Sequence, residues 1–249
     1  EWYDFFIYGT AAALVFPTLF FAEDMPRYVS LIASFSTFAV GFLARPVGGV
    51  VFGHFGDRVG RKAALVTALM MMGVATTLIG LLPSYERVGP LAPLLLIFLR
   101  FVQGLAVGGQ WGGAMLLVTE NAPSDQRGFY GAFAQVGAPA GLVLANLAFL
   151  AVSGNLSDEA FMDWGWRVPF ISSVLLIGLS LYVQLKLEDT EAFKELAQAA
   201  IPAKTKPRSP VLQALKTYPR EIGLAAGSFL GVQVTFYICV AWIISYGND

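Results

Sequence analysis

Three charged side chains lie inside long apolar stretches of this sequence: Asp4, Arg45 and Arg100. A charge within an apolar helix is costly in lipid, so such residues are candidates for a functional role. Asp4 can gain and lose a proton, whereas Arg100 keeps its proton and is a fixed positive charge. An acid that titrates beside a fixed cation can couple proton movement to the movement of an anionic or zwitterionic solute.

Two hypotheses follow for these charges. In the first, Asp4 carries the coupled proton and Arg100 anchors a carboxylate of the substrate. In the second, Asp4 forms a permanent structural ion pair with Arg45 or Arg100. Arg45 lies 12 residues before Asp57, or about 18 Å along a helix, which places it within the membrane. Pro46 follows it, and we expect a structural or gating role for Arg45, with substrate contact as the second interpretation.

Uncharged polar residues accompany these charges at helical spacing. Asp4 and Tyr8 share one helical face, and similar stripes run through the fourth and fifth apolar stretches. A polar stripe on an apolar helix should face water or protein. Gln233 and Tyr237 lie in the seventh stretch, and for these two residues ordinary helix packing is an equally good explanation. The predicted substrate contacts are Tyr8, Arg100, Gln103, Gln110, Trp111, Gln135, Asn146, Gln233 and Tyr237.

The elements that carry these residues must be membrane helices. The chain has 249 residues, of which 56% are hydrophobic and only 13% are charged, and its mean hydropathy is +0.64. A soluble domain carries about 25% charged residues, and a membrane helix needs about 20 mostly apolar residues. Seven such stretches are visible, and no strand is this long. They are 2–21, 30–52, 63–82, 91–118, 129–152, 168–186 and 221–246.

The fold class predicted is therefore an all-α membrane protein, a six-helix bundle followed by a seventh transmembrane helix. We expect the bundle over 1–186, a linker over 187–220 and the first helix of a second bundle over 221–249. Lys and Arg gather in the connections 53–62, 119–128 and 187–220 and are sparse in the alternate ones. Because positive loops stay in the cytoplasm, these three connections are predicted to be cytoplasmic.

The connection 53–62 reads GHFGDRVGRK. Its glycines permit a tight turn, Asp57 can begin a helix, and its basic residues can pair with carboxylates or helix ends. An ordinary positive loop is the less favoured explanation.

The 53–62 connection resembles the signature loop of the major facilitator superfamily, and R100-F-V-Q-G104 resembles the superfamily's fourth-helix motif. Glu120 and Arg127 of the next cytoplasmic connection resemble its E…R-G pair. The resemblance implies a gating loop whose members are Gly53, Asp57, Arg58, Gly60, Arg61, Lys62, Glu120 and Arg127. Four further passages are similar to the metabolite:proton symporter family, which carries proline and betaine, shikimate, citrate or α-ketoglutarate. They are EWYDF with Tyr8 and Gly9, RPVGG from Arg45, GGQWGGA from Gly108, and WGWRVPF from Trp164.

The resemblance implies secondary active transport of a small organic acid or zwitterion across a bacterial inner membrane. It implies proton symport by a monomer of twelve helices in two bundles, of which this chain would lack helices eight to twelve. Helices one, two, four, five and seven would line the cavity, with three and six outside. Members often carry glutamate at Gln110, so the amide weakens a direct transfer of their coupling. A facilitator or exchanger without proton coupling, or a non-transporting sensor, is the alternative.

Other classes lack their sequence signals. No phosphate-binding loop of the G-x-x-x-x-G-K-[ST] type occurs, and a net charge of −1 gives no field for nucleic acid. His54 and Cys239 are the only histidine and cysteine, so neither a metal site nor a catalytic triad is predicted. A membrane enzyme would need several His or Asp residues near one interface. We therefore expect no enzyme activity and no cofactor.

Overall fold

The computed structural model describes residues 2–22, 24–186 and 216–246, and all elements in these ranges are helices. The chain divides at Ile201–Pro202 into two units, which are described separately. The second unit contains one described helix, α13 (Pro219–Tyr246). The first contains α1 (Trp2–Leu14), α2 (Phe16–Leu19), α3 (Arg27–Val59), α4 (Arg61–Gly80), α5 (Tyr85–Val88), α6 (Leu91–Asn121), α7 (Arg127–Ser153), α8 (Asp158–Ala160), the π-helix η1 (Phe161–Gly165), α9 (Arg167–Ile171) and α10 (Val174–Lys186).

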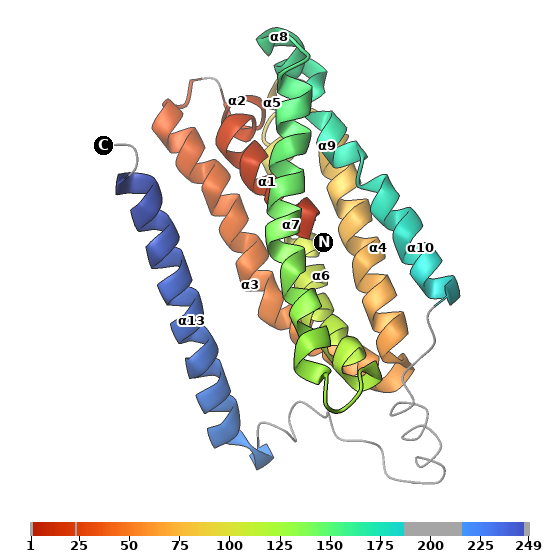
Figure 1. The fold of residues 1–249 in the computed structure, drawn as a ribbon. Helices are drawn as coiled ribbons and strands as arrows, with labels where there is room; N and C mark the ends of the chain where they lie inside the picture. The colour runs from red at the N-terminus through yellow and green to blue at the C-terminus, as the bar shows by residue number, and fades with distance from the viewer. Residues whose placement is uncertain (1, 23, 187–215, 247–249) are drawn as a thin grey trace. The chain divides into compact units, whose positions relative to one another are not determined.

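The all-α fold class is confirmed, and each predicted span corresponds to a helix or a pair of helices (Figure 1). Four helical segments among the described residues are long and apolar enough to cross a membrane by length and composition. They are Arg27–Gly56, Lys62–Gly80, Leu91–Gln110 and Arg127–Ser153. The first predicted span is interrupted at Val15, between α1 and α2, and the sixth is interrupted at Ser172–Ser173, between α9 and α10. The predicted linker lies mostly outside the described residues, and the domain boundaries remain a prediction.

The prediction of a loop over 53–62 with Asp57 at a helix start was wrong, whereas the tight turn expected from its glycines is present at Gly60. Helix α3 continues to Val59 and α4 begins at Arg61, so the turn is Gly60 alone. Gly60 has φ +117°, a conformation that a residue with a Cβ rarely adopts. Asp57 therefore lies in the last turn of α3 and does not begin a helix. Hydrophobic burial continues through this corner, because Phe52 packs with Ala64 and Ala68 of α4.

Helices α3 and α6 pack backbone against backbone. A Cβ on Gly108 would overlap the carbonyl of Arg45, and one on Gly48 would overlap the carbonyl of Leu105. Gly104 approaches Gly41 in the same way. Small residues are the means by which membrane helices approach closely, since lipid supplies no hydrophobic drive between them. This contact brings the two intramembrane arginines, one on each helix, into the same region of the bundle.

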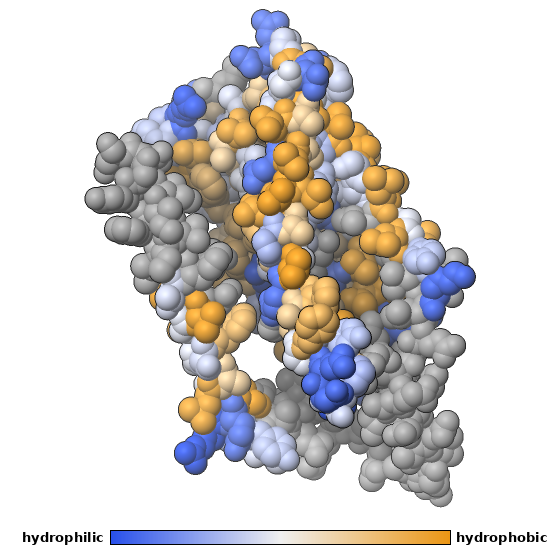
Figure 2. Space-filling model, in the orientation of Figure 1, coloured by the Kyte–Doolittle hydropathy of each residue, from blue (hydrophilic) through white to orange (hydrophobic). Residues whose placement is uncertain are grey.

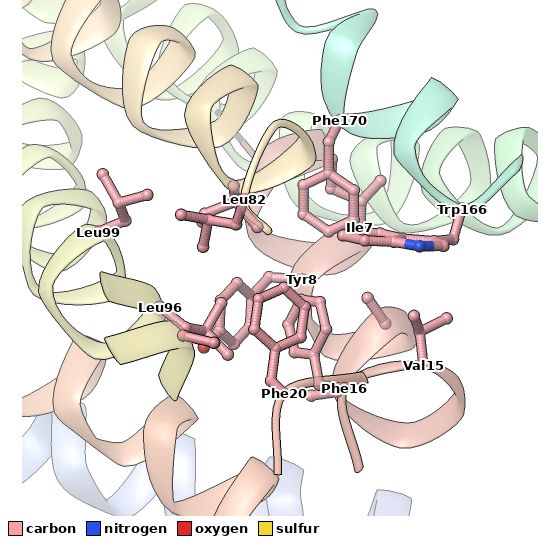
Figure 3. Packing of buried hydrophobic residues seen from close by; sticks show 14 of the residues in the cluster. Ile7, Tyr8, Val15, Phe16, Phe20, Leu82, Leu96, Leu99, Trp166 and Phe170 are labelled. Atoms are coloured by element: carbon pink, nitrogen blue, oxygen red, sulfur yellow. The ribbon is translucent and has the colours of Figure 1, made fainter. Parts of the chain in front are cut away.

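A cluster of aromatic rings packs inside the first unit (Figure 3). Phe16, Phe20 and Trp166 meet edge to face with ring centroids 5.2 to 6.1 Å apart, and Phe170 stands 5.7 Å from Trp166. Edge-to-face pairs of this kind add about 0.5–1.5 kcal/mol each beyond the burial of their area. The cluster attaches the short helices α2 and α9 to α1.

The outward side of the first unit is apolar. Figure 2 shows mainly hydrophobic residues along α7 and α10. Exposed large hydrophobic side chains of α7 form most of this surface: Phe129, Phe133, Val136, Leu142, Val143, Leu144, Leu147 and Leu150. Such a surface is stable in lipid and would aggregate in water, so the chain is a multi-pass membrane protein.

Candidate functional site

Asp4 lies fully buried inside the first unit, with 0% of its surface exposed. Its Oδ1 accepts a 2.5 Å hydrogen bond from the hydroxyl of Ser173. The hydroxyl of Thr76 also lies at the carboxyl group, but it donates its own proton to the carbonyl of Met72 at 2.8 Å. Oδ2 is consequently left without a hydrogen-bond partner in the described part of the chain. A buried carboxylate oxygen in this condition is a natural position for a proton.

Arg100 is equally enclosed, with 1% of its surface exposed. Its guanidinium carbon stands 4.1 Å from the ring centroid of Tyr8, 4.3 Å from that of Phe38 and 4.8 Å from that of Phe5. Ring faces stabilise a cation that has been removed from water. Nη1 donates to Oε1 of Gln103 at 2.9 Å, while Nε and Nη2 have no hydrogen-bond partner among the residues described.

Hydrogen bonds connect Arg100 to the neighbourhood of Asp4. Gln103 accepts from Arg100 through its oxygen and donates through Nε2 to the Thr76 hydroxyl at 2.8 Å. Thr76 is the side chain that also stands at the Asp4 carboxyl group. The acid and the cation are thus connected through an amide and a hydroxyl, from helices α6 and α4.

The second hypothesis for Asp4 required an ion pair with one of the arginines. In the described residues the hydrogen bonds of Asp4 and Arg100 go to Ser173 and Gln103, respectively. Arg45 is half-buried, and its guanidinium carbon stands 4.6 Å from the Phe5 centroid and 4.3 Å from that of Phe42. The ring of Phe5 therefore contacts two guanidinium groups, because Arg100 lies against the same ring.

Four more predicted contacts have described side chains, and of these only Tyr8 touches Arg100. Tyr8 is buried, and its hydroxyl shares a 2.5 Å hydrogen bond with Thr37. Gln110 is 2% exposed, but it lies two helical turns beyond Gln103 along α6. Gln135 and Asn146 are exposed on α7 and are not brought to Asp4. The side chains of Trp111, Gln233 and Tyr237 lie outside the described residues, and all these assignments remain predictions.

The gating residues at the predicted cytoplasmic end are placed only in part. Arg58 and Arg127 are exposed, Lys62 is half-buried, and a Cβ on Gly53 would meet nothing within 4 Å. The side chains of Asp57, Arg61 and Glu120 lie outside the described residues. No group of three or more His, Cys, Asp or Glu side chains comes together in the ranges described.

Sequence reasoning missed five residues of the site. Phe38 and Phe42 precede Arg45 by seven and three residues and so share its helical face, a signal that was available. Phe5 follows Asp4 directly, but its contacts with Arg45 of α3 and Arg100 of α6 depend on the tertiary structure. Thr76 and Ser173 come from the third and sixth spans, which were expected to lie outside the cavity, and their sequence context distinguishes neither from an ordinary hydroxyl of a helix.

A family model described as "Sugar (and other) transporter" matches residues 1–240. The inner membrane metabolite transport protein YhjE of Escherichia coli is 48% identical over 248 residues, covering 100% of this chain and 55% of that protein. The shikimate transporter of the same organism is 45% identical (100% and 56% covered), and its proline/betaine transporter is 34% identical (99% and 50%). The chain thus spans about half the length of the curated relatives it matches.

Solved structures of the xylose transporter XylE from E. coli share the fold. The inward-open conformation matches with a TM-score of 0.68 at 18% identity, covering 94% of this chain and 53% of that one. The proton:xylose symporter bound to 6-bromo-6-deoxy-D-glucose matches with a TM-score of 0.66 at 16% identity, covering 78% and 43%. The chain belongs to the sugar (and other) transporter family, and its fold is that of the amino-terminal half of a major facilitator.

Proposed function

We propose that this chain forms about half of a secondary active transporter that moves a small organic acid or zwitterion together with protons. The family and the relatives named for metabolites, shikimate and proline/betaine support transport of a small solute. Alternating access works by one bundle moving against the other, so the function belongs to the full-length protein.

The observation that carries proton coupling is the setting of Asp4. The carboxyl group is fully buried on a membrane helix, one oxygen is held by Ser173, and the other has no hydrogen-bond partner in the described residues. A buried carboxylate without full hydrogen bonding is costly, and a proton removes that cost. Opening of the site to either side of the membrane would let water stabilise the ionised form, which makes proton release depend on conformation.

The role of Arg100 as the anchor of a substrate carboxylate remains part of the proposal. Its Nε and Nη2 can still donate, and a carboxylate accepts two parallel hydrogen bonds from a guanidinium. The rings of Phe5 and Phe38 lie against this guanidinium, so a substrate reaches it in a conformation where a ring has moved aside. Arg45 is the second candidate for substrate contact, because it is only half-buried.

The placement in the cell is also proposed from the relatives. A relative named as an inner membrane protein and the distribution of Lys and Arg support a bacterial inner membrane, with 53–62, 119–128 and 187–220 on the cytoplasmic side. We propose the arrangement of a bundle over 1–186, a linker over 187–220 and the start of the second bundle over 221–249, in a transporter that works as a monomer.

Uptake by the full-length protein in proteoliposomes tests this function. Radiolabelled shikimate, proline and betaine are supplied with and without an inward proton gradient. Asp4→Asn, which keeps the shape and removes the titration, is expected to abolish accumulation driven by the gradient and to retain exchange of internal for external solute. Asp24→Asn, at an exposed aspartate, is the matched control and should behave like wild type.

The alternatives give different results in the same assay. A facilitator or exchanger moves solute without accumulation under a proton gradient, and a sensor binds solute without moving it. If Asp4→Asn accumulates solute as wild type does, the coupling role of Asp4 is wrong.

A further inference from the structure

Thr76 occupies a position that the transport proposal does not yet use. It is fully buried on α4, it accepts from Nε2 of Gln103, and it donates to the carbonyl of Met72. Its oxygen stands at the carboxyl group of Asp4, whose Oδ2 is without a partner in the described residues. Two of the three groups around this hydroxyl are therefore hydrogen-bonded to it, and the third is the titratable one.

The hydrogen-bonding capacity of a hydroxyl decides what this arrangement can accept. A threonine oxygen has one proton to donate and two acceptor positions. The proton goes to Met72 and one acceptor position takes the amide of Gln103. One acceptor position is left, and it can receive a proton donated by the carboxylic acid of Asp4. The ionised carboxylate has no proton to offer, so a hydroxyl that donates to Met72 can bond only to a protonated Asp4.

Ionisation of Asp4 requires the hydroxyl to turn. Thr76 would then donate to the carboxylate and give up its bond to the Met72 carbonyl, which still accepts the ordinary helical bond from a backbone N–H. The oxygen would keep accepting from Gln103, but from a new direction. Gln103 also accepts a hydrogen bond from Nη1 of Arg100. Rotation of the Thr76 hydroxyl therefore changes the hydrogen bond between Gln103 and Arg100.

We propose that Thr76 is a positioning residue for the coupled proton, and that its hydroxyl changes from acceptor to donor as Asp4 ionises and conveys this change through Gln103 to Arg100. The inference rests on the proposed role of Asp4 in proton coupling. No proton passes along the chain: it leaves Asp4 for water when the site opens, and the hydroxyl and the amide only reorient. A substrate bound at Arg100 would alter the same hydrogen bonds, Arg100 to Gln103 and Gln103 to Thr76, beginning at Arg100.

Other charged groups near Asp4 are few in the described part of the chain. Arg100 of α6 and Arg45 of α3 approach the region around Phe5. Tyr3 of α1 lies within electrostatic range of Asp4, and its hydroxyl bonds to Pro169 and Ser172. On the remaining packed helices the charged residues stand at the ends, and on α9 Arg167 binds carbonyls of Gly80 and Leu82. The end residues are Arg61 and Lys62 on α4, Arg127 on α7 and Lys186 on α10.

The test compares two adjacent threonines of α4 in the full-length protein. Thr76→Val keeps the shape and removes the hydroxyl, and Thr76→Ser keeps the hydroxyl. Thr77 makes the same type of bond, a 2.8 Å donation to the carbonyl four residues earlier, at Gly73, so Thr77→Val is the matched control. Gradient-driven accumulation, exchange without a gradient, and the pH profile of uptake are measured in proteoliposomes.

We expect Thr76→Val to lower accumulation about tenfold, which corresponds to the loss of one hydrogen bond at an ionisable group. Exchange should stay within about twofold of wild type, and the pH midpoint of uptake should be displaced. Thr76→Ser should restore both properties, and Thr77→Val should match wild type. Gln103→Met should displace the pH midpoint of uptake in the same direction as Thr76→Val, which keeps the proposal testable if that variant folds poorly. Because Gln103 is also a predicted substrate contact, its exchange activity is not used as a criterion.

Two results would overturn the inference alone. In one, Thr76→Val accumulates solute with a wild-type pH profile although Asp4→Asn does not accumulate. In the other, Thr76→Val loses exchange together with accumulation, as expected for a residue that only holds the helices together. If Asp4→Asn itself is unaffected, the proposed function fails, and the two failures are therefore distinguishable.

Discussion

Ser173 donates a 2.5 Å hydrogen bond to Oδ1 of Asp4, joining residues 169 positions apart in the chain. The neighbouring residues repeat the contact, since the hydroxyls of Tyr3 and Ser172 share a 2.9 Å hydrogen bond. Both serines lie at the interruption between α9 and α10. The interrupted sixth span therefore positions the buried acid of the first span.

Ser173→Ala should impair coupling more than transport. Removing the hydroxyl leaves Oδ1 without its hydrogen bond from Ser173, while Oδ2 already has no partner in the described residues. Hydrogen bonds to a charged group are worth about 1.5–3 kcal/mol. We expect gradient-driven accumulation by the full-length protein to fall about tenfold, with exchange retained. Ser172→Ala, which removes a contact of Tyr3 and not of Asp4, should have a smaller effect. Equal losses in the two variants would contradict a specific role for Ser173.

Phe5→Leu should destabilise the protein because one ring faces two guanidinium groups. A cation–π contact removed from water is worth about 2 kcal/mol, so the loss should be about 2–4 kcal/mol. Thermal unfolding of the full-length protein in detergent measures the change. The control is Phe35→Leu on α3, where the ring is 47% exposed. A similar fall in Tm for both variants would show that the two arginines do not depend on the Phe5 ring.

Gly108→Ala should separate α3 from α6. The added methyl group would overlap the backbone of Arg45, and backbone cannot move aside as a side chain can. Overpacking of this kind costs about 1–3 kcal/mol, which a lowered Tm will report. Gly178→Ala on α10 is the control, because its Cβ would meet nothing within 4 Å. An unchanged Tm for Gly108→Ala would mean that the close contact of the two helices is not needed for stability.

Arg167→Gln should loosen one end of the bundle. Nη1 of Arg167 donates to the carbonyls of Gly80 and Leu82 at 2.8 and 2.7 Å, which the end of α4 would otherwise leave unsatisfied. The expected loss is about 1–2 kcal/mol, at the lower end for charged hydrogen bonds because the side chain is half-buried. Arg87→Gln, at an exposed arginine nearby, should not lower Tm. If it does so equally, a general charge effect explains the result.

The sequence by itself determined the class of protein and the number and order of its predicted spans. Apolar runs of this length have one stable solution in lipid, a helix that satisfies its own backbone, so their presence could be predicted without tertiary information. Asp4, Arg100 and Gln103 could also be singled out, because a charge in an apolar run is conspicuous and helical spacing places its neighbours on one face. The prediction of the 53–62 connection as a loop was wrong, because polar residues near a membrane surface can extend a helix as readily as form a turn.

Only the tertiary structure decided which side chains these residues meet. The contact of α3 with α6 depends on glycines that meet across two helices, and it brings Arg45 and Arg100 to the ring of Phe5. The partners of Asp4 come from α4 and from the interruption before α10, where Thr76 and Ser173 look like any other hydroxyl in a helix. Periodicity shows which face of a helix is polar, but hydrogen-bond partners are set by the packing of helices far apart in the chain, and a single sequence does not encode that packing in a form that local rules can read.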